Sequence, residues 1–203
     1  MNAIAPQTVR AIATLFPREN FVDGCVIGSP PRSLEHITAL YLSGESAKKV
    51  ADLFQYTNLI RTHVIGNEID QASALKMCYA SLQKGFTAIA IQSCVTAKLF
   101  GLDEILFKEL NVSSSATFDR LNRSVPGMAP KAGRWVGEME EIAKTYEAIG
   151  LSPKLFEGAA ETYRFVSEQT PLGKEIIEER KQGQTLDTAL ELMVQSLNPN
   201  KKS

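Results

Sequence analysis

Lys76 stands among small, apolar and uncharged polar residues in the stretch QASALKMCYASLQ, residues 71–83. Removing the charge of a lysine from water is unfavourable, so its ammonium must either reach solvent or be held in a cleft by other groups. On a helix, Ser73 and Tyr79 lie three residues before and after Lys76 and share its face. Hydroxyl groups beside a cation would suit an anionic or hydroxylated small molecule. The alternative is a lysine whose stem crosses a half-exposed helix while its ammonium stays in water.

The overall composition is that of an ordinary soluble globular protein. The chain has 203 residues, of which 44% are hydrophobic and 22% are charged, and its formal net charge is −1. A near-neutral chain without long basic runs gives no electrostatic reason to expect a nucleic acid as partner. The apolar run at residues 85–97 is shorter than the roughly 20 residues that span a bilayer, so no membrane partner is expected.

Cysteine and histidine usage limits the other kinds of site. Cys25, Cys78 and Cys94 lie too far apart for a C-x-x-C site, and their odd number argues against a disulfide framework. A reducing compartment, the cytoplasm, is therefore expected. His36 and His63 have no neighbours of the types that bind metal, so no metal site is expected. For Cys25, a small buried core residue is favoured over a nucleophile, because no His base lies near it in the sequence.

The hydrophobic pattern changes once along the chain, near Gly66. Before it, helical and strand patterns alternate, which predicts a helix at 6–16, strands at 21–28, 37–44 and 59–66, and a helix at 45–57. After it the strand patterns stop, and a long helical pattern runs from about 68 to 100, interrupted only by Gly85. Further helices are expected at 102–110, 114–121, 135–150, 153–168 and 185–197. An α/β portion followed by an all-helical domain is the predicted fold class.

Three stretches follow one another in an order and spacing that resembles the β-hydroxyacid dehydrogenase superfamily, related to 6-phosphogluconate dehydrogenase. They are FVDGCVIGSPP from residue 21, VIGNEIDQASALKMCYASLQKG from residue 64, and GRWVGEMEEIAKTYEAIGL from residue 133. The branch with a variant C-terminal helical domain matches best. The resemblance implies that residues 1–66 are the C-terminal part of a Rossmann-type dinucleotide-binding domain. It also implies that residues 67–203 are a helical substrate and dimerisation domain like that of 6-phosphogluconate dehydrogenase.

The same resemblance implies a catalytic lysine and its neighbours. Family members carry that lysine on the long interdomain helix, where it exchanges a proton with the substrate hydroxyl as hydride passes to or from NAD or NADP. Lys76 matches it. The asparagines that follow in the family are here Tyr79 and Ala80, so the substrate is expected to differ from a simple β-hydroxy acid. Ser73 and Tyr79 are expected to contact that substrate.

A second expected substrate contact lies at the end of the first strand. The family has a D-x-P-V-S-G-G-type strand end there, and Gly28 and Ser29 are the expected contacts in this chain. Asp23, Val26 and Gly28 match the family, whereas Cys25, Ile27 and Ser29 replace its proline, serine and last glycine. The family also uses a helix that begins Lys-Asp for cofactor and substrate contacts. This chain has Gly137-Glu138 instead, so Glu138 is a candidate cofactor contact.

The sequence lacks a G-x-G-x-x-G motif, which grips the dinucleotide pyrophosphate in the family. We therefore expect a chain that starts inside the nucleotide-binding domain and is inactive by itself. The alternative is a non-catalytic helical domain that serves dimerisation or partner binding. A homodimer formed through the helical domain is expected, because the apolar helix at 86–100 needs cover and because the resemblance implies one.

Overall fold

The computed structural model describes residues 3–28 and 37–197, which are arranged in two compact units. Met1–Leu82 and Glu141–Pro153 make up the first unit, whereas Gln83–Glu140 and Lys154–Ser203 make up the second. Each unit is described below by itself.

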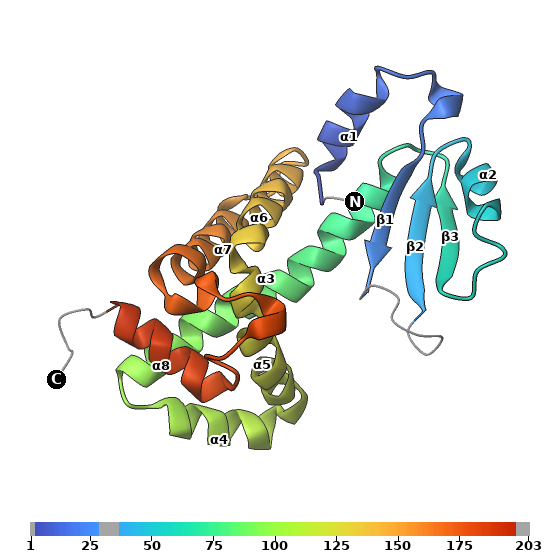
Figure 1. Ribbon diagram of the computed structural model, residues 1–203. Helices are drawn as coiled ribbons and strands as arrows, with labels where there is room; N and C mark the ends of the chain where they lie inside the picture. Colours follow the sequence, from blue (N-terminus) through green and yellow to red (C-terminus); the bar gives the residue numbers. More distant parts are fainter. Residues whose placement is uncertain (1–2, 29–36, 198–203) are drawn as a thin grey trace. The chain divides into compact units, whose positions relative to one another are not determined.

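The first unit is built on a three-stranded sheet with the strand order β1-β2-β3 (Figure 1). The strands are β1 (Asp23–Ile27), β2 (Thr38–Ser43) and β3 (Ile60–Gly66), which correspond to the three predicted strands. β1 is antiparallel to β2, and β2 is parallel to β3. The parallel pair is joined through the helix α2 (Ala47–Asp52), as a β-α-β crossover requires.

Side chains of β2 point alternately to the two faces of the sheet, and those on one face form the core of this unit. Leu40 and Leu42 are two residues apart, so both point to the same face of the sheet, where they form a buried cluster with Ala47 of α2. Partly buried side chains that pack against this cluster are Val22, Val26, Val50, Ala51, Phe54 and Ile60. The helix predicted at 45–57 is shorter than expected, since α2 ends at Asp52. Residues 53–56 form turns, and Leu53 and Tyr56 are exposed.

Helix α1 (Pro6–Ala13) also belongs to the first unit, with Pro6 in its first turn. The main-chain N–H of Ala5 donates a hydrogen bond to Oε2 of Glu141, with 2.8 Å between the two atoms. The Arg10 guanidinium donates to the Asp70 carboxylate across 2.6 Å. Residues 141–153 are thus tied to the start of the chain, about 136 residues earlier.

The long predicted helix is present as α3 (Gln71–Leu99), and no strand follows it in the part of the chain that the structure describes. α3 runs through Gly85, the one residue that interrupts the helical pattern, as expected for a single helix over most of 68–100. A glycine inside a helix is less favourable than alanine by about 1 kcal/mol. At this position a Cβ atom would lie 3.2 Å from the Phe156 ring, so the missing side chain permits close packing. α3 ends before Gly101, whose φ of +68° suits a residue after a helix C-terminus.

Five more α-helices follow α3 in the described part of the chain. They are α4 (Asp103–Ser113), α5 (Ser115–Met128), α6 (Ala132–Glu147), α7 (Lys154–Arg164) and α8 (Leu186–Leu197). Shorter helical turns lie at Arg18–Asn20, Ala129–Lys131, Phe165–Gln169, Pro171–Lys174 and Ile177–Glu179. Fully buried side chains of the second unit include Met128, Met139, Tyr163, Leu172 and Leu190. A small sheet in an α/β portion followed by helices agrees with the predicted fold class. Among the described helices, none combines the length and apolar character needed to cross a lipid bilayer.

Candidate functional site

Lys76 lies in the second turn of α3, and its half-buried side chain reaches β1. Its ammonium Nζ donates a hydrogen bond to the main-chain oxygen of Val26, with 2.6 Å between the two atoms. Val26 is two residues before Gly28, where the substrate contact at the strand end is expected. The structure therefore places the Lys76 ammonium near the end of β1, where the sequence resemblance predicts a substrate contact.

Asp23, at the start of β1, holds the first turn of α3 through Ser73. The main-chain N–H of Ser73 donates to Oδ2 of Asp23 at 2.6 Å, and the Ser73 hydroxyl donates to Oδ1 at 2.8 Å. The Asp23 residue is only 7% exposed. Burial raises the pKa of the Asp23 carboxyl above its ordinary 3.8, and the nearby charge of Asp70 adds to the rise, whereas the two Ser73 hydrogen bonds oppose it.

Ser43, the last residue of β2, supplies a second acceptor to the same turn. Its Oγ accepts a hydrogen bond from the main-chain N–H of Ala72 at 3.0 Å. The first N–H groups of a helix have no partner within the helix, so they need acceptors from elsewhere. Here two neighbouring strands provide them. Sequence reasoning missed these roles of Asp23 and Ser43, although a carboxylate at the start of an otherwise apolar strand was a possible signal.

Cys25 follows Asp23 by two residues and is buried. Burial raises the pKa of its thiol to about 11, while the nearby Lys76 ammonium acts in the opposite direction. Cys25 is therefore a neutral thiol at neutral pH. Its burial agrees with the expected small core residue.

The other predicted substrate contacts are placed as follows. Gly28 is exposed and has a φ of +110°, a left-handed conformation that favours glycine. Ser29 lies outside the described residues. Tyr79 is one helical turn beyond Lys76 and is 41% exposed, so a ligand could reach its ring. The hydroxyl of Ser73 already donates its hydrogen to Asp23, so only its oxygen is left to accept a hydrogen bond from a substrate.

Glu138, the candidate cofactor contact, belongs to the second unit. Its carboxylate forms an ion pair with Lys84 and lies 3.6 Å from the guanidinium of Arg134. The Lys84 ammonium is also 4.9 Å from the centroid of the Trp135 ring, which packs edge-on against Tyr163 at 5.3 Å between centroids. The carboxylate of Glu138 is thus neutralised by neighbouring cations, and its contact with a cofactor stays a prediction.

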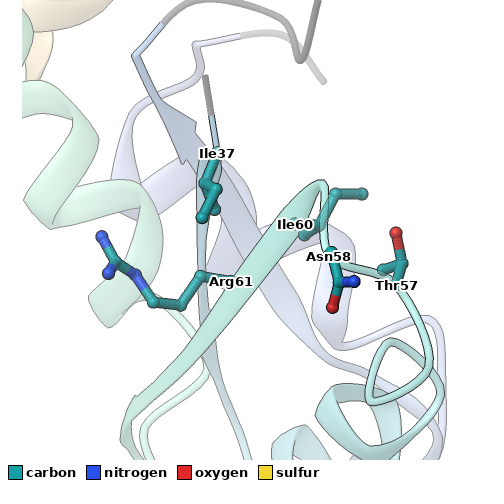
Figure 2. Close-up of a pocket in the computed structure, with 5 residues that line it drawn as sticks. All are labelled: Ile37, Thr57, Asn58, Ile60 and Arg61. Carbon is teal, nitrogen blue, oxygen red and sulfur yellow. The ribbon is translucent and has the colours of Figure 1, made fainter. Parts of the chain in front are cut away.

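A cavity of about 490 Å³ lies at the end of the sheet where β2 and β3 begin. Figure 2 shows Arg61 extending to one side of β3, whereas Ile60, Asn58 and Thr57 lie on the other side. The described residues that line this cavity are Ile37, Thr57, Asn58, Ile60 and Arg61. None of these was predicted as a site residue. Within residues 3–28 and 37–197, no group of three or more His, Cys, Asp or Glu side chains is placed to hold a metal ion.

Comparisons with known proteins identify the fold. A family model described as a domain of unknown function, DUF1932, matches residues 97–166. A conserved hypothetical protein from Sinorhizobium meliloti 1021 superimposes with a TM-score of 0.74 and 22% identity, over 97% of this chain and 64% of that protein. The conserved protein MTH1747, of unknown function and described as structurally similar to 3-hydroxyacid dehydrogenases, superimposes with a TM-score of 0.64 and 25% identity. That match covers 82% of this chain and 64% of MTH1747. This chain has a 3-hydroxyacid dehydrogenase-like fold.

Two further relatives extend the comparison. A 3-hydroxyisobutyrate dehydrogenase from Salmonella typhimurium shares the hydroxyacid dehydrogenase-like fold, with a TM-score of 0.59 and 17% identity over 93% of this chain and 66% of that enzyme. An uncharacterized 28.5 kDa protein from Methanothermus fervidus is 27% identical over 169 residues, which are 83% of this chain and 65% of the relative. The resemblance expected from the three sequence stretches is thus confirmed. The chain spans about two thirds of the length of these relatives.

Proposed function

We propose that this chain forms the lysine-bearing part of an NAD(P)-dependent oxidoreductase that acts on a small hydroxy-acid-type substrate. The observation that carries the proposal is the hydrogen bond from Lys76 Nζ to the Val26 oxygen, which holds a cation beside the strand end at Gly28. The hydroxyacid dehydrogenase-like fold supports the class of reaction. Gly28, Ser29, Ser73 and Tyr79 are the proposed substrate contacts.

Lys76 is proposed to act as a general acid/base. An ammonium has three hydrogens, of which the Val26 carbonyl accepts one and so fixes the direction of the group. Held there, the ammonium can exchange a proton with a substrate hydroxyl or with the carbonyl oxygen that replaces it. Cys25 beside it is a neutral thiol and does not compete for that proton.

The described residues do not by themselves fit a dinucleotide. The sequence has no G-x-G-x-x-G motif, and the one candidate cofactor contact, Glu138, is ion-paired with Lys84. We therefore propose that residues 1–203 alone neither turn over NAD(P)H nor bind it specifically, and that a segment carrying this motif restores both. The nicotinamide part of the proposal rests on the fold and on the sequence resemblance, and no step is derived through it.

The test measures turnover of NAD(P)H with a panel of small hydroxy and keto acids. Residues 1–203 should be inactive, and the same chain joined to a dinucleotide-binding segment should be active. In the joined protein, Lys76→Ala should lower kcat by about 10²–10⁴, the usual contribution of a general acid/base. Dinucleotide affinity should be nearly unchanged, since Lys76 acts on the substrate. Unchanged turnover in Lys76→Ala would refute the role of Lys76, and turnover by residues 1–203 alone would refute the need for the added segment.

We also propose a homodimer formed through the second unit, which would equally serve a non-catalytic protein. Ile89 and Leu155 are 53% and 58% exposed, although both are apolar. They border a cavity of about 220 Å³ whose wall includes the small residues Gly85, Ala88 and Gly158. Because the apolar side chains and the shallow cavity lie together, a second copy could cover both. The presence of only free cysteines among the described residues is compatible with the proposed cytoplasmic location.

Sedimentation at micromolar concentration tests the dimer. Wild type should sediment as a dimer, and Ile89→Lys should shift it toward monomer. Ile105→Lys is the matched control, because Ile105 is 67% exposed and lies on α4. A monomeric wild type, or equal effects of the two substitutions, would count against this interface.

A further inference from the structure

Asp23 is a buried carboxylate with both oxygens bonded to a single residue of the long helix. Its Oδ1 and Oδ2 accept from the hydroxyl and the main-chain N–H of Ser73, at 2.8 and 2.6 Å. These two bonds cross 50 positions of sequence. Such a pair fixes both the position and the rotation of the helix turn to which it binds.

Lys76 lies one turn further along the face that Ser73 occupies. Three residues of helix rise about 4.5 Å, whereas the three residues from Asp23 to Val26 span about 10 Å of strand. The lysine side chain spans the difference, and its Nζ bonds to the Val26 oxygen. The helix and strand are therefore joined at two points, one at Ser73 and one at the lysine ammonium.

The ammonium can occupy its place only if the first turn of α3 is held at the start of β1. The second acceptor in this turn, Ser43, bonds to Ala72 and not to Ser73. Without the Asp23 carboxylate, the buried N–H of Ser73 loses its acceptor, and the turn is left with the Ser43 bond alone. The first turn would then be held less firmly against β1, and the lysine bond to Val26 would be weakened with it.

We infer that Asp23 is the positioning residue for Lys76: its carboxylate anchors the first turn of α3, so that the ammonium is held on the Val26 carbonyl at the proposed site. The functional meaning of this inference rests on the proposed role of Lys76, but the structural relationship does not. Asp23 itself is not expected to touch the substrate.

The test compares how fast Lys76 is acetylated by N-hydroxysuccinimidyl acetate in wild type and variants of the 203-residue chain. Mass spectrometry gives the Lys76 rate, and the exposed Lys108 in the same molecule serves as the reference. Asp23→Ala should raise the ratio of the Lys76 rate to the Lys108 rate about fivefold, the order of factor that accompanies loss of one hydrogen bond. Asp23→Asn should restore part of the wild-type ratio, because its amide oxygen can still accept the Ser73 N–H.

Ser73→Ala is the matched control, because it removes the hydroxyl and keeps the main-chain N–H that bonds to Oδ2. Its ratio should stay nearer to wild type than that of Asp23→Ala. Circular dichroism identifies variants that fold to the same helical content. If Asp23→Ala does not fold, Asp23→Asn decides the question, since its ratio must still exceed that of wild type. Equal ratios in wild type and the folded Asp23 variants would overturn the inference.

The same measurements separate this inference from the proposed function. A changed Lys76 ratio together with no effect of Lys76→Ala on turnover would retain the positioning role and reject the catalytic one. Loss of turnover in Lys76→Ala together with unchanged ratios in the Asp23 variants would retain the catalytic role of Lys76 and reject the positioning role of Asp23.

Discussion

Lys76 and Val26 are joined by a hydrogen bond of 2.6 Å between residues 50 positions apart in the chain. The bond links a side chain of α3 to the main chain of β1, so it places a cation beside a strand end. A main-chain carbonyl cannot be removed by substitution. The contribution of the bond must therefore be measured from the lysine side.

Lys76→Met should lower the free energy of unfolding by about 1 kcal/mol, because it keeps most of the apolar stem and removes one hydrogen bond to a partly buried carbonyl. Urea unfolding measures the change. Lys108→Met is the control, since Lys108 is exposed on α4 and its substitution should stay within about 0.5 kcal/mol of wild type. Equal effects of the two substitutions would show that the Val26 bond adds no stability.

The three cysteines should differ in reactivity toward a disulfide reagent such as 5,5′-dithiobis(2-nitrobenzoic acid). Cys78 is exposed, whereas Cys25 and Cys94 are buried and their thiol pKa values are raised to about 11. Since the thiolate is the reactive form, one thiol per chain should react quickly in the native protein and three after unfolding. Cys78→Ser should abolish the fast reaction. Two or more fast thiols in the native wild type would contradict the buried positions.

The pKa of Asp23 predicts a direction for the pH dependence of stability. Because this pKa is raised above 3.8, the folded chain holds the Asp23 proton to a higher pH than the unfolded chain does. The free energy of unfolding therefore falls as pH rises from 3.8 through the raised pKa, relative to a variant that cannot ionise there. Urea unfolding of wild type and Asp23→Asn, from below pH 3.8 to neutrality, should show the wild-type advantage shrinking as pH rises. An advantage that grows with pH would contradict the burial argument.

Substitution by alanine should change the stability of the protein in opposite directions at two glycines of the second unit. At Gly173 a Cβ atom would lie 2.3 Å from the main-chain oxygen of Ser167, which cannot move aside easily. Gly173→Ala should therefore destabilise the protein by at least 2 kcal/mol, as overpacking against rigid groups does. Gly137 lies inside α6 with no atom within 4 Å of the added Cβ, so Gly137→Ala should stabilise by about 0.5–1 kcal/mol. Thermal unfolding of both variants checks the pair. A stable Gly173→Ala would refute the packing at Ser167, and a destabilised Gly137→Ala would refute the open space at Gly137.

The positions of the strands and of the long helix could be predicted because local patterns encode them. Short β-rich runs that end in glycine predicted β1 to β3, and the pattern from 68 to 100 predicted α3 with its ends nearly correct. The close approach of the Phe156 ring to Gly85 was not predicted, because it joins residues far apart in the sequence. The antiparallel direction of β1 was also not predicted, since alternation is the same whichever way a strand runs.

The candidate site was only partly visible in the sequence. Lys76 and Gly28 were found through spacing and resemblance, and the structure adds the Val26 oxygen as the partner of the lysine. Asp23 and Ser43 were not recognised as supports of α3, because capping signals that can be read from a sequence lie within a few residues of the helix start. Here the acceptors come from 50 and 29 positions away.

The distant acceptors at the start of α3 also bear on the order of events during folding. Most amides of this helix bond to carbonyls four residues earlier, and such bonds form within about a microsecond once a helix nucleates. The amides of Ala72 and Ser73 must wait until β2 and β1 are close enough to present Ser43 and Asp23. In pulsed hydrogen exchange during refolding, these two amides should gain protection later than the middle of α3, at the rate at which the sheet assembles. The protection of these two helix amides would therefore measure when β1 and β2 pack against α3.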